Sequence, residues 1–149
     1  MLVATWRKLQ ERQAVLKSAV IQVSIGCSYE RAYRFLSDPQ NYPRLSPVPD
    51  VVLEPVKGEQ RAFIVELPSG RGKLRFSQRN EYGVLDYTVA DLATGREHTT
   101  PVRIVANQEA SELIMLLFQR PGVDDARFAS DVEWTRNDLE SIKSLLEAL

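Results

Sequence analysis

The sequence has a single cysteine and a single histidine, and this scarcity excludes several kinds of chemistry. Cys27 alone cannot form an internal disulfide, and one unpaired cysteine is typical of a protein in a reducing compartment. A zinc site needs about four Cys, His or carboxylate ligands at suitable spacing, which these two residues do not supply. A thiol nucleophile needs a base beside it, and His98 lies on a strand distant from Cys27 in the sequence. We therefore expect no metal site and no cofactor.

The sequence also lacks an excess charge of either sign and any long apolar run. Its 19 Lys and Arg residues against 20 Asp and Glu residues leave a formal net charge of -1. No overall field therefore draws the protein to nucleic acid or to an anionic membrane. No stretch approaches the roughly 18 uncharged apolar residues that a membrane span needs. Because Arg7 and Lys8 stand where a signal peptide has its apolar run, we expect a cytoplasmic protein without stable membrane insertion.

What is present is the composition of one globular domain with an extension. The chain of 149 residues is 44% hydrophobic and 26% charged, which suffices for a buried core. Residues 1–17 predict an N-terminal helical extension, and residues 18–149 predict the domain itself. The helix has a narrow stripe of Leu2, Trp6, Leu9, Gln13 and Leu16. We expect this helix either to pack loosely on the domain or, because Trp6 lies near Arg7 and Lys8, to form a homodimer or lie on a membrane surface.

The first half of the domain predicts a strand and two short helices. A strand over residues 19–26 is followed by Ser28, a suitable N-cap for a helix ending at Leu36. Asp38-Pro39 then starts a second short helix, because proline at the first helical position is already in helical φ. A rigid crossing segment follows, since helix is interrupted by Pro43, Pro47 and Pro49.

From Val51 onward the pattern becomes that of an antiparallel meander closed by a long helix. Five turn signals join six short strands; they lie at residues 57–60, 68–71, 81–83, 93–95 and 107–109. After Pro121-Gly122 the apolar period returns to that of a helix, with Asp124 and Asp125 at the positive helix end. The helical stripe consists of Phe128, Val132, Thr135, Leu139, Ile142, Leu146 and Leu149.

The hairpin turns determine which residues share a face of this predicted sheet. A two-residue loop at Ser69-Gly70 places Val65 opposite Leu74. The later turns place Phe76 opposite Tyr87, Tyr87 opposite Thr100, and Ile104 opposite Leu113. One face is then mainly apolar and must be covered: Phe63, Val65, Leu67, Leu74, Phe76, Gln78, Leu85, Tyr87, Val89, His98, Thr100, Val102, Ile104, Leu113, Met115 and Leu117.

The opposite face alternates in charge and can lie against water. On it Asp86 and Glu112 flank Arg103 diagonally, and Arg75 and Arg79 lie diagonal to Asp86. Two carboxylates around an arginine resemble a site, but cross-strand pairs of this kind contribute only about 0.2–1 kcal/mol each to stability. We interpret the cluster as a structural ion ladder.

The polar members of the apolar face are Gln78, Tyr87, His98 and Thr100. An apolar pocket with a few convergent polar groups is the usual form of a small-molecule site, although these four side chains could instead satisfy one another or lie at a wet edge. The predicted cavity lining is Phe63, Leu74, Phe76, Gln78, Tyr87, His98, Thr100, Val102, Met115, Leu139 and Ile142. His98 and Tyr87 are the candidate catalytic residues, as an acid–base pair.

The segment Phe35-Leu36-Ser37-Asp38-Pro39-Gln40-Asn41-Tyr42-Pro43-Arg44-Leu45-Ser46-Pro47 resembles START-like proteins of the polyketide cyclase/dehydrase type. The run from Glu112 to Leu149 is similar to the same family, and the resemblance covers roughly residues 18–149. It implies an α+β helix-grip fold, in which a curved antiparallel sheet of about seven strands wraps around a long C-terminal helix. No catalytic motif is common to the family, so no catalytic residue is carried over.

The resemblance also implies a cavity for lipids, polyketides, hormones or other hydrophobic molecules. The leading hypothesis is therefore that the protein carries or senses a small hydrophobic ligand between sheet and helix. A second hypothesis is a cyclase or dehydratase acting on such a ligand. A third is an interaction module, comparable to ribosome-associated toxins or chaperone activators, that works through the N-terminal helix and Trp134.

Overall fold

The computed structural model describes residues 15–149, so the predicted N-terminal helix falls almost entirely outside the described residues. The elements in chain order are β1 (Ser18–Ile25), α2 (Tyr29–Leu36), the short 3-10 helix η1 (Pro39–Asn41), α3 (Tyr42–Leu45), β2 (Glu54–Pro55), β3 (Ala62–Leu67), β4 (Gly70–Phe76), β5 (Tyr87–Asp91), β6 (Glu97–Thr100), β7 (Val102–Asn107), β8 (Ala110–Phe118) and α4 (Asp125–Glu147). This is an α+β fold, as the sequence predicts.

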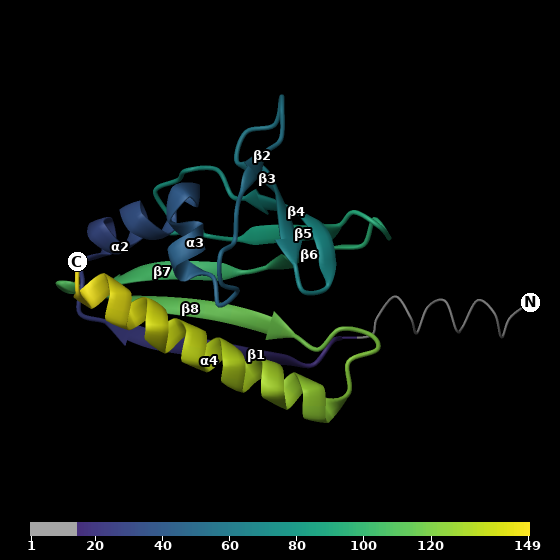
Figure 1. Cartoon of the computed structure of the whole chain (residues 1–149). Coiled ribbons are helices and arrows are strands. Elements are labelled where there is room, and N and C mark those ends of the chain that lie inside the picture. Colours follow the sequence, from purple (N-terminus) through teal and green to yellow (C-terminus); the bar gives the residue numbers. More distant parts are fainter. Residues whose placement is uncertain (1–14) are drawn as a thin grey trace, which may run out of the picture.

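The strands form two antiparallel sheets that meet at a corner (Figure 1). One has the order β1-β8-β7 and the other β2-β3-β4-β5-β6. The sequence pattern predicts one strand where the structure has β6 and β7, separated by Pro101. Proline donates no ladder hydrogen bond and fixes φ, so the strand turns from one sheet into the other there. This division raises the number of strands from about seven to eight.

The strand registers match the predicted pairs in three hairpins and differ in one. Phe76 lies opposite Tyr87, Tyr87 opposite Thr100, and Ile104 opposite Leu113. In the β3–β4 hairpin, however, Leu67 pairs with Gly70, so Pro68 and Ser69 form the loop and Val65 faces Gly72 instead of Leu74. Pro68 suits the first loop position, and Gly70 adopts the positive φ of +123° that follows it. The shift is two residues, so the predicted faces are unchanged.

Ser28 caps α2 as predicted, and a short helix starts at Asp38-Pro39 as predicted, with Asp38 as its cap. The Ser28 side chain accepts a hydrogen bond from the Arg31 amide, and Asp38 accepts one from the Gln40 amide. The first cap starts α2 directly after β1, and the second starts η1 with Pro39 in its first turn. These two short elements and α3 lie near the C-terminal end of α4 (Figure 1).

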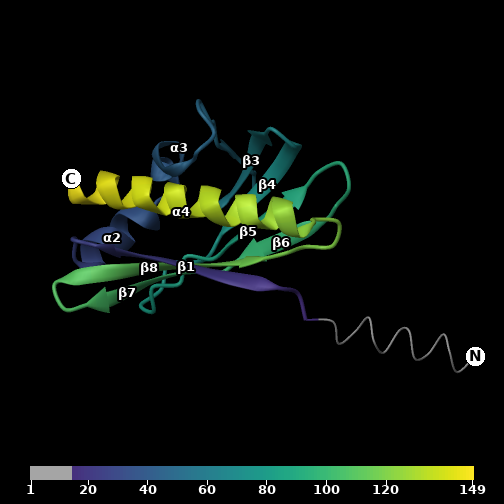
Figure 2. The ribbon, with the colours of Figure 1, turned by 90° about the horizontal axis from the view of Figure 1, so that it is seen from below.

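Helix α4 runs along β1 on the lower side of the strands in Figure 1, and it crosses in front of the sheets when seen from below in Figure 2. Asp124 caps it by accepting a hydrogen bond from the Arg127 amide. Its stripe buries Phe128, Leu139 and Leu146, of which Leu139 is 1% and Leu146 0% exposed, whereas Leu149 at the end of the stripe is exposed. The helix is joined to β1 at its C-terminal end, where Glu147 accepts a hydrogen bond from the Gly26 amide (2.8 Å) and Lys143 donates one to the Ser24 carbonyl (2.9 Å).

The charged face of the sheet holds part of the predicted ion ladder. Arg103 pairs with Asp86 as predicted, whereas Arg75 pairs with Glu97 at 3.8 Å instead of with Asp86. Glu112 instead accepts hydrogen bonds from Asn107, Gln22 and Ser24, and these lower the pKa of its carboxyl. Among the helices of residues 15–149, none has the length and apolar character needed to cross a membrane.

A glycine pair provides a test of how the two sheets are joined. Gly83 adopts φ +69°, and a Cβ there would lie 2.0 Å from the Ile104 carbonyl oxygen, which is a severe steric clash with the backbone. Gly95 adopts nearly the same φ, +71°, with open space around it. Gly95→Ala should therefore lower the free energy of unfolding only by the cost of a left-handed backbone, about 1–2 kcal/mol. Gly83→Ala should lower it by at least about 2 kcal/mol more, because of the steric clash. Urea unfolding measures both values, and equal losses would contradict the close approach.

Candidate functional site

The space between the sheets and α4 contains a cavity of about 450 Å³, which we call the inner cavity. This volume lies in the range of about 300–1,000 Å³ that is typical of small-molecule sites. Most of its lining is apolar. The lining comprises Leu36, Tyr42, Leu45, Ser46, Pro47, Val48, Leu67, Ser69, Phe76, Leu85, Tyr87, Val89, His98, Thr100, Val102, Leu113, Met115, Leu117, Thr135, Asp138, Leu139 and Ile142.

The structure brings together most, but not all, of the residues expected to line one cavity. Phe76, Tyr87, His98, Thr100, Val102, Met115, Leu139 and Ile142 border it. Phe63 and Leu74 do not. Leu74 is fully buried in a separate cluster with Val51 and Val65, because the proline-rich segment after α3 covers that end of the sheet. Phe63 packs edge-on against Phe76 at 6.0 Å between ring centroids, so Phe76 stands between it and the cavity.

Gln78 is exposed and does not border the cavity, because β4 ends at Phe76. The chain then forms a turn organised by Asn80, whose side-chain oxygen accepts hydrogen bonds from the Tyr82 and Val84 amides. The Asn80 amide itself donates to the Tyr33 hydroxyl at 2.8 Å. Alternation along the strand therefore stops two residues before Gln78, and its side chain has no assigned face.

The polar groups of the inner cavity include two tyrosines, Tyr42 and Tyr87. Burial raises the pKa of Tyr87, and a hydrogen bond with Thr100 partly opposes this shift. Thr100 is the residue directly across from Tyr87 on β6. Burial also raises the pKa of Tyr42, with the neighbouring Tyr87 acting in the same direction and Ser46 opposing it. Both hydroxyls therefore remain protonated at neutral pH and can donate hydrogen bonds to a ligand.

Asp138 is a cavity residue that the sequence pattern does not reveal. It lies on α4 next to the buried Leu139 and reaches the same cavity from the helix side. Burial raises the pKa of its carboxyl, and its charge acts on Tyr87. A carboxyl group in mainly apolar surroundings, close to a tyrosine hydroxyl, can exchange a proton with a ligand. The signal available in the sequence was its position three residues after Thr135, on the same helical face.

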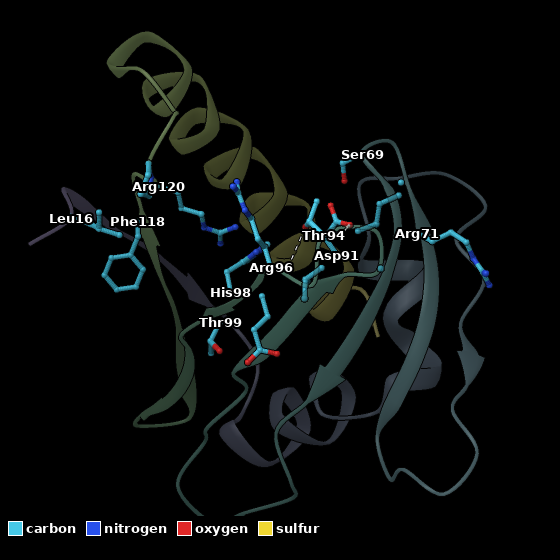
Figure 3. A pocket seen from close by; sticks show the side chains of 16 residues that line it. Leu16, Ser69, Arg71, Asp91, Thr94, Arg96, His98, Thr99, Phe118 and Arg120 are labelled. Atoms are coloured by element: carbon cyan, nitrogen blue, oxygen red, sulfur yellow. Dashed lines mark hydrogen bonds between the residues drawn. The ribbon is translucent and has the colours of Figure 1, made fainter. Parts of the chain in front are cut away.

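His98 lies where the inner cavity meets a second, larger space of about 820 Å³, which we call the vestibule (Figure 3). Burial lowers the pKa of His98, and the nearby Arg120 lowers it further. Four residues border both spaces and therefore lie between them, and we call this group the neck: Leu67, Ser69, Val89 and His98. The vestibule walls also carry Arg71, Asp91, Arg96, Glu97 and Arg120.

Cys27 is buried away from both spaces, as a small core residue, and its carbonyl oxygen accepts a hydrogen bond from Ser111 at 2.9 Å. Within residues 15–149, no three His, Cys, Asp or Glu side chains gather as a metal site requires. The candidate site of the described chain is therefore the inner cavity with its neck and vestibule.

Comparison with protein-family models gives no match for this sequence, and no curated protein sequence matches it. Solved structures do. A START superfamily protein from Mycobacterium smegmatis matches with a TM-score of 0.61 at 14% identity, over 88% of this chain and 97% of that chain. The Aha1 dimer from Colwellia psychrerythraea matches with a TM-score of 0.66 at 13% identity, over 89% of this chain and 97% of that chain. Ara h 8.0201 matches with a TM-score of 0.64 at 10% identity, over 91% of this chain and 100% of that chain.

The chain has the START-like helix-grip fold. The resemblance that the Asp38-Pro39 segment predicts is thereby confirmed at the level of fold. Identities this low concern architecture alone, so the helix-grip fold locates a cavity under α4 without saying what enters it.

The cavity carboxyl of this helix-grip domain predicts an unusual pH dependence of stability. Because burial raises the pKa of Asp138, the folded state holds its proton more tightly than the unfolded state does, and this group lowers stability as the pH rises. Asp138→Asn should therefore be more stable than the wild type at pH 7, and the difference should shrink toward about pH 3, below the unfolded pKa. Thermal unfolding across this pH range measures the difference.

The matched control is Glu140→Gln, two residues along α4 on its exposed side. It should show no comparable gain at neutral pH. A variant Asp138→Asn that is less stable than the wild type by the same amount at every pH would contradict a destabilising carboxylate in the cavity.

Proposed function

We propose that the protein binds a small hydrophobic ligand, such as a lipid or polyketide, in the inner cavity between the sheets and α4. The observation that carries this proposal is the cavity itself, about 450 Å³ with mainly apolar walls. A well-packed interior leaves few voids larger than a water molecule, so a space of this size is available to a ligand. Transfer of apolar ligand surface from water into such a space is the driving force for binding.

The arrangement of the walls supports binding that is both apolar and oriented. Apolar side chains come from three sources, namely the sheet strands, α4 and the segment after α3. The hydroxyls of Tyr42, Tyr87 and Thr100 add a small number of donors and acceptors on one side. A few polar groups in an apolar pocket fix the orientation of a bound molecule. START-like neighbours have the same architecture, which supports the proposal by analogy of fold.

Filling the inner cavity should weaken ligand binding. Met115 borders it from β8, so Met115→Trp places a larger side chain in space that the ligand would occupy. We expect the affinity for a neutral aliphatic probe, decanol, to fall at least about tenfold, which corresponds to 1.4 kcal/mol. Isothermal titration calorimetry measures the affinity, and circular dichroism verifies that the variant is folded.

The matched control is Leu116→Trp on the same strand. Leu116 pairs with Val20 of β1, which is 64% exposed, so this position faces away from the cavity. It should bind decanol as the wild type does. The proposal is wrong if wild-type protein binds neither decanol nor an aromatic polyketide mimic.

A second candidate function, a dehydratase acting in the same cavity, is favoured by one observation, the placement of Asp138 near Tyr87. For a β-hydroxy ketone, the carboxylate would remove the α-proton while the tyrosine hydroxyl protonates the departing hydroxyl group. Water and an enone then form, and the proton on Asp138 returns to the tyrosinate, so the balance closes. His98, the base that the sequence suggests, borders the same cavity at its neck.

This second function predicts enone formation from an aliphatic β-hydroxy ketone, followed by ultraviolet absorbance. Loss of one acid–base partner typically costs about 10²–10⁴-fold in rate, so Asp138→Asn and Tyr87→Phe should each lose activity to that extent while still binding decanol. A His98→Gln variant with the same loss would identify His98 as the base instead. Wild-type protein that binds the ketone without producing enone excludes this dehydratase.

A further inference from the structure

The vestibule differs from the inner cavity in its chemistry, although the two spaces are adjacent. Leu67, Ser69, Val89 and His98 border both, so the two spaces lie on either side of these four side chains. The inner cavity is lined mainly by apolar side chains, whereas the vestibule carries several charged ones. An elongated ligand occupying both would therefore need an apolar part and a charged part.

The acidic side chains of the vestibule already have partners. Asp91 accepts hydrogen bonds from the amides of Ala93 at 2.7 Å and Thr94 at 3.1 Å, and so stabilises its own turn. Glu97 pairs with Arg75 at 3.8 Å on the charged face of the sheet. Each of these two carboxylates therefore already has a favourable interaction within the protein.

The cations of the vestibule fall into two groups. Arg71 is neutralised by Glu66 at 2.7 Å and lies near Glu54 at 3.9 Å. Arg96 and Arg120 form no ion pair within the part of the chain that the structure describes, residues 15–149. Figure 3 shows their side chains extending over the vestibule, Arg96 from the turn before β6 and Arg120 from the segment after β8.

Arg120 is the more constrained of the two guanidinium groups. It is half-buried, and burial lowers its pKa, so its charge is partly removed from water. The acidic residue that acts on it, Asp131, is itself paired with Arg127 at 2.9 Å. A partly desolvated cation without a close counter-charge is unfavourable unless an anion binds beside it.

We propose that the natural ligand is an anionic amphiphile, whose apolar chain occupies the inner cavity and whose carboxylate or phosphate head lies in the vestibule against Arg96 and Arg120. This inference rests on the proposed function and adds the chemical class of the ligand. The guanidinium group suits such heads, because its planar array of donors matches the oxygens of a carboxylate or phosphate. The head leaves water only in part, since the vestibule is open at its outer side.

The test compares three probes with the same aliphatic chain, namely decanoate, decyl phosphate and decanol, by isothermal titration calorimetry below their micelle concentrations. We expect wild-type protein to bind at least one anionic probe about tenfold or more tightly than decanol, as charge-assisted hydrogen bonds would produce. The better of decanoate and decyl phosphate identifies the head group. Arg120→Gln and Arg96→Gln should each reduce this preference severalfold, and the double variant should remove it.

The control variant is Arg79→Gln, which removes an exposed arginine outside both spaces and should leave the preference unchanged. The salt dependence of binding by the wild type tests the same proposal if a variant fails to fold. Raising the salt concentration from 0.05 M to 0.5 M should weaken the binding of the anionic probes and not that of decanol, because salt screens exposed charges.

The outcomes separate the two proposals. Equal affinities for the three probes, insensitive to salt and to both arginine variants, would overturn the anionic head while leaving hydrophobic binding intact. A preference for anions that Arg79→Gln reduces as much as Arg120→Gln would also overturn it, since general charge would then be responsible. Absence of binding by all three probes would count against the proposed function itself.

Discussion

The packing of α4 against β1 is the interaction on which the rest of the structure depends. Leu139 and Leu146 are completely covered there, and each such side chain contributes about 1.5–3 kcal/mol when it is fully buried. Hydrogen bonds from Gly26 to Glu147 and from Lys143 to Ser24 hold the C-terminal end of the helix to β1. Around Thr135, Asp138 and Ile142 the same helix borders the inner cavity instead of closing on the sheet. One element therefore closes the core and forms a cavity wall.

The division of the sheet at Pro101 has a consequence for the site. Because β6 and β7 belong to different sheets, His98 and Thr100 lie on one side of the corner and Val102 on the other, yet all three border the inner cavity. The bent strand thus curves the cavity wall. Links across the corner keep it closed, among them the hydrogen bond from the Leu85 amide to the Val102 carbonyl at 2.9 Å. A flat sheet would not enclose α4 in this way.

Short-range features were predictable because their causes are local. The cap at Ser28, the short helix that starts at Asp38-Pro39, the pairing of Phe76 with Tyr87 and the stripe of α4 each depend on a few neighbouring residues. The misplaced features depend on the competition between local signals. Pro68 and Gly70 both favour turns, and the loop formed at Pro68-Ser69, one position earlier than the predicted Ser69-Gly70. The turn held by Asn80 ended β4 early and left Gln78 in solvent, which strand alternation alone could not foresee.

The residues by themselves determined the fold class, the order of the elements and the apolar face that needed covering, since each follows from periodicity and turn chemistry along the chain. Only the tertiary structure decided which apolar residues border empty space and which are packed. Leu74 and Val102 lie on the same predicted face, but the segment after α3 covers the first and leaves the second at the inner cavity. The tertiary structure also decided that Asp138 and Tyr87 border the same cavity and that Arg96 and Arg120 border the same vestibule. Those relations join residues from separate elements, and their distances are determined by how α4 and the two sheets pack.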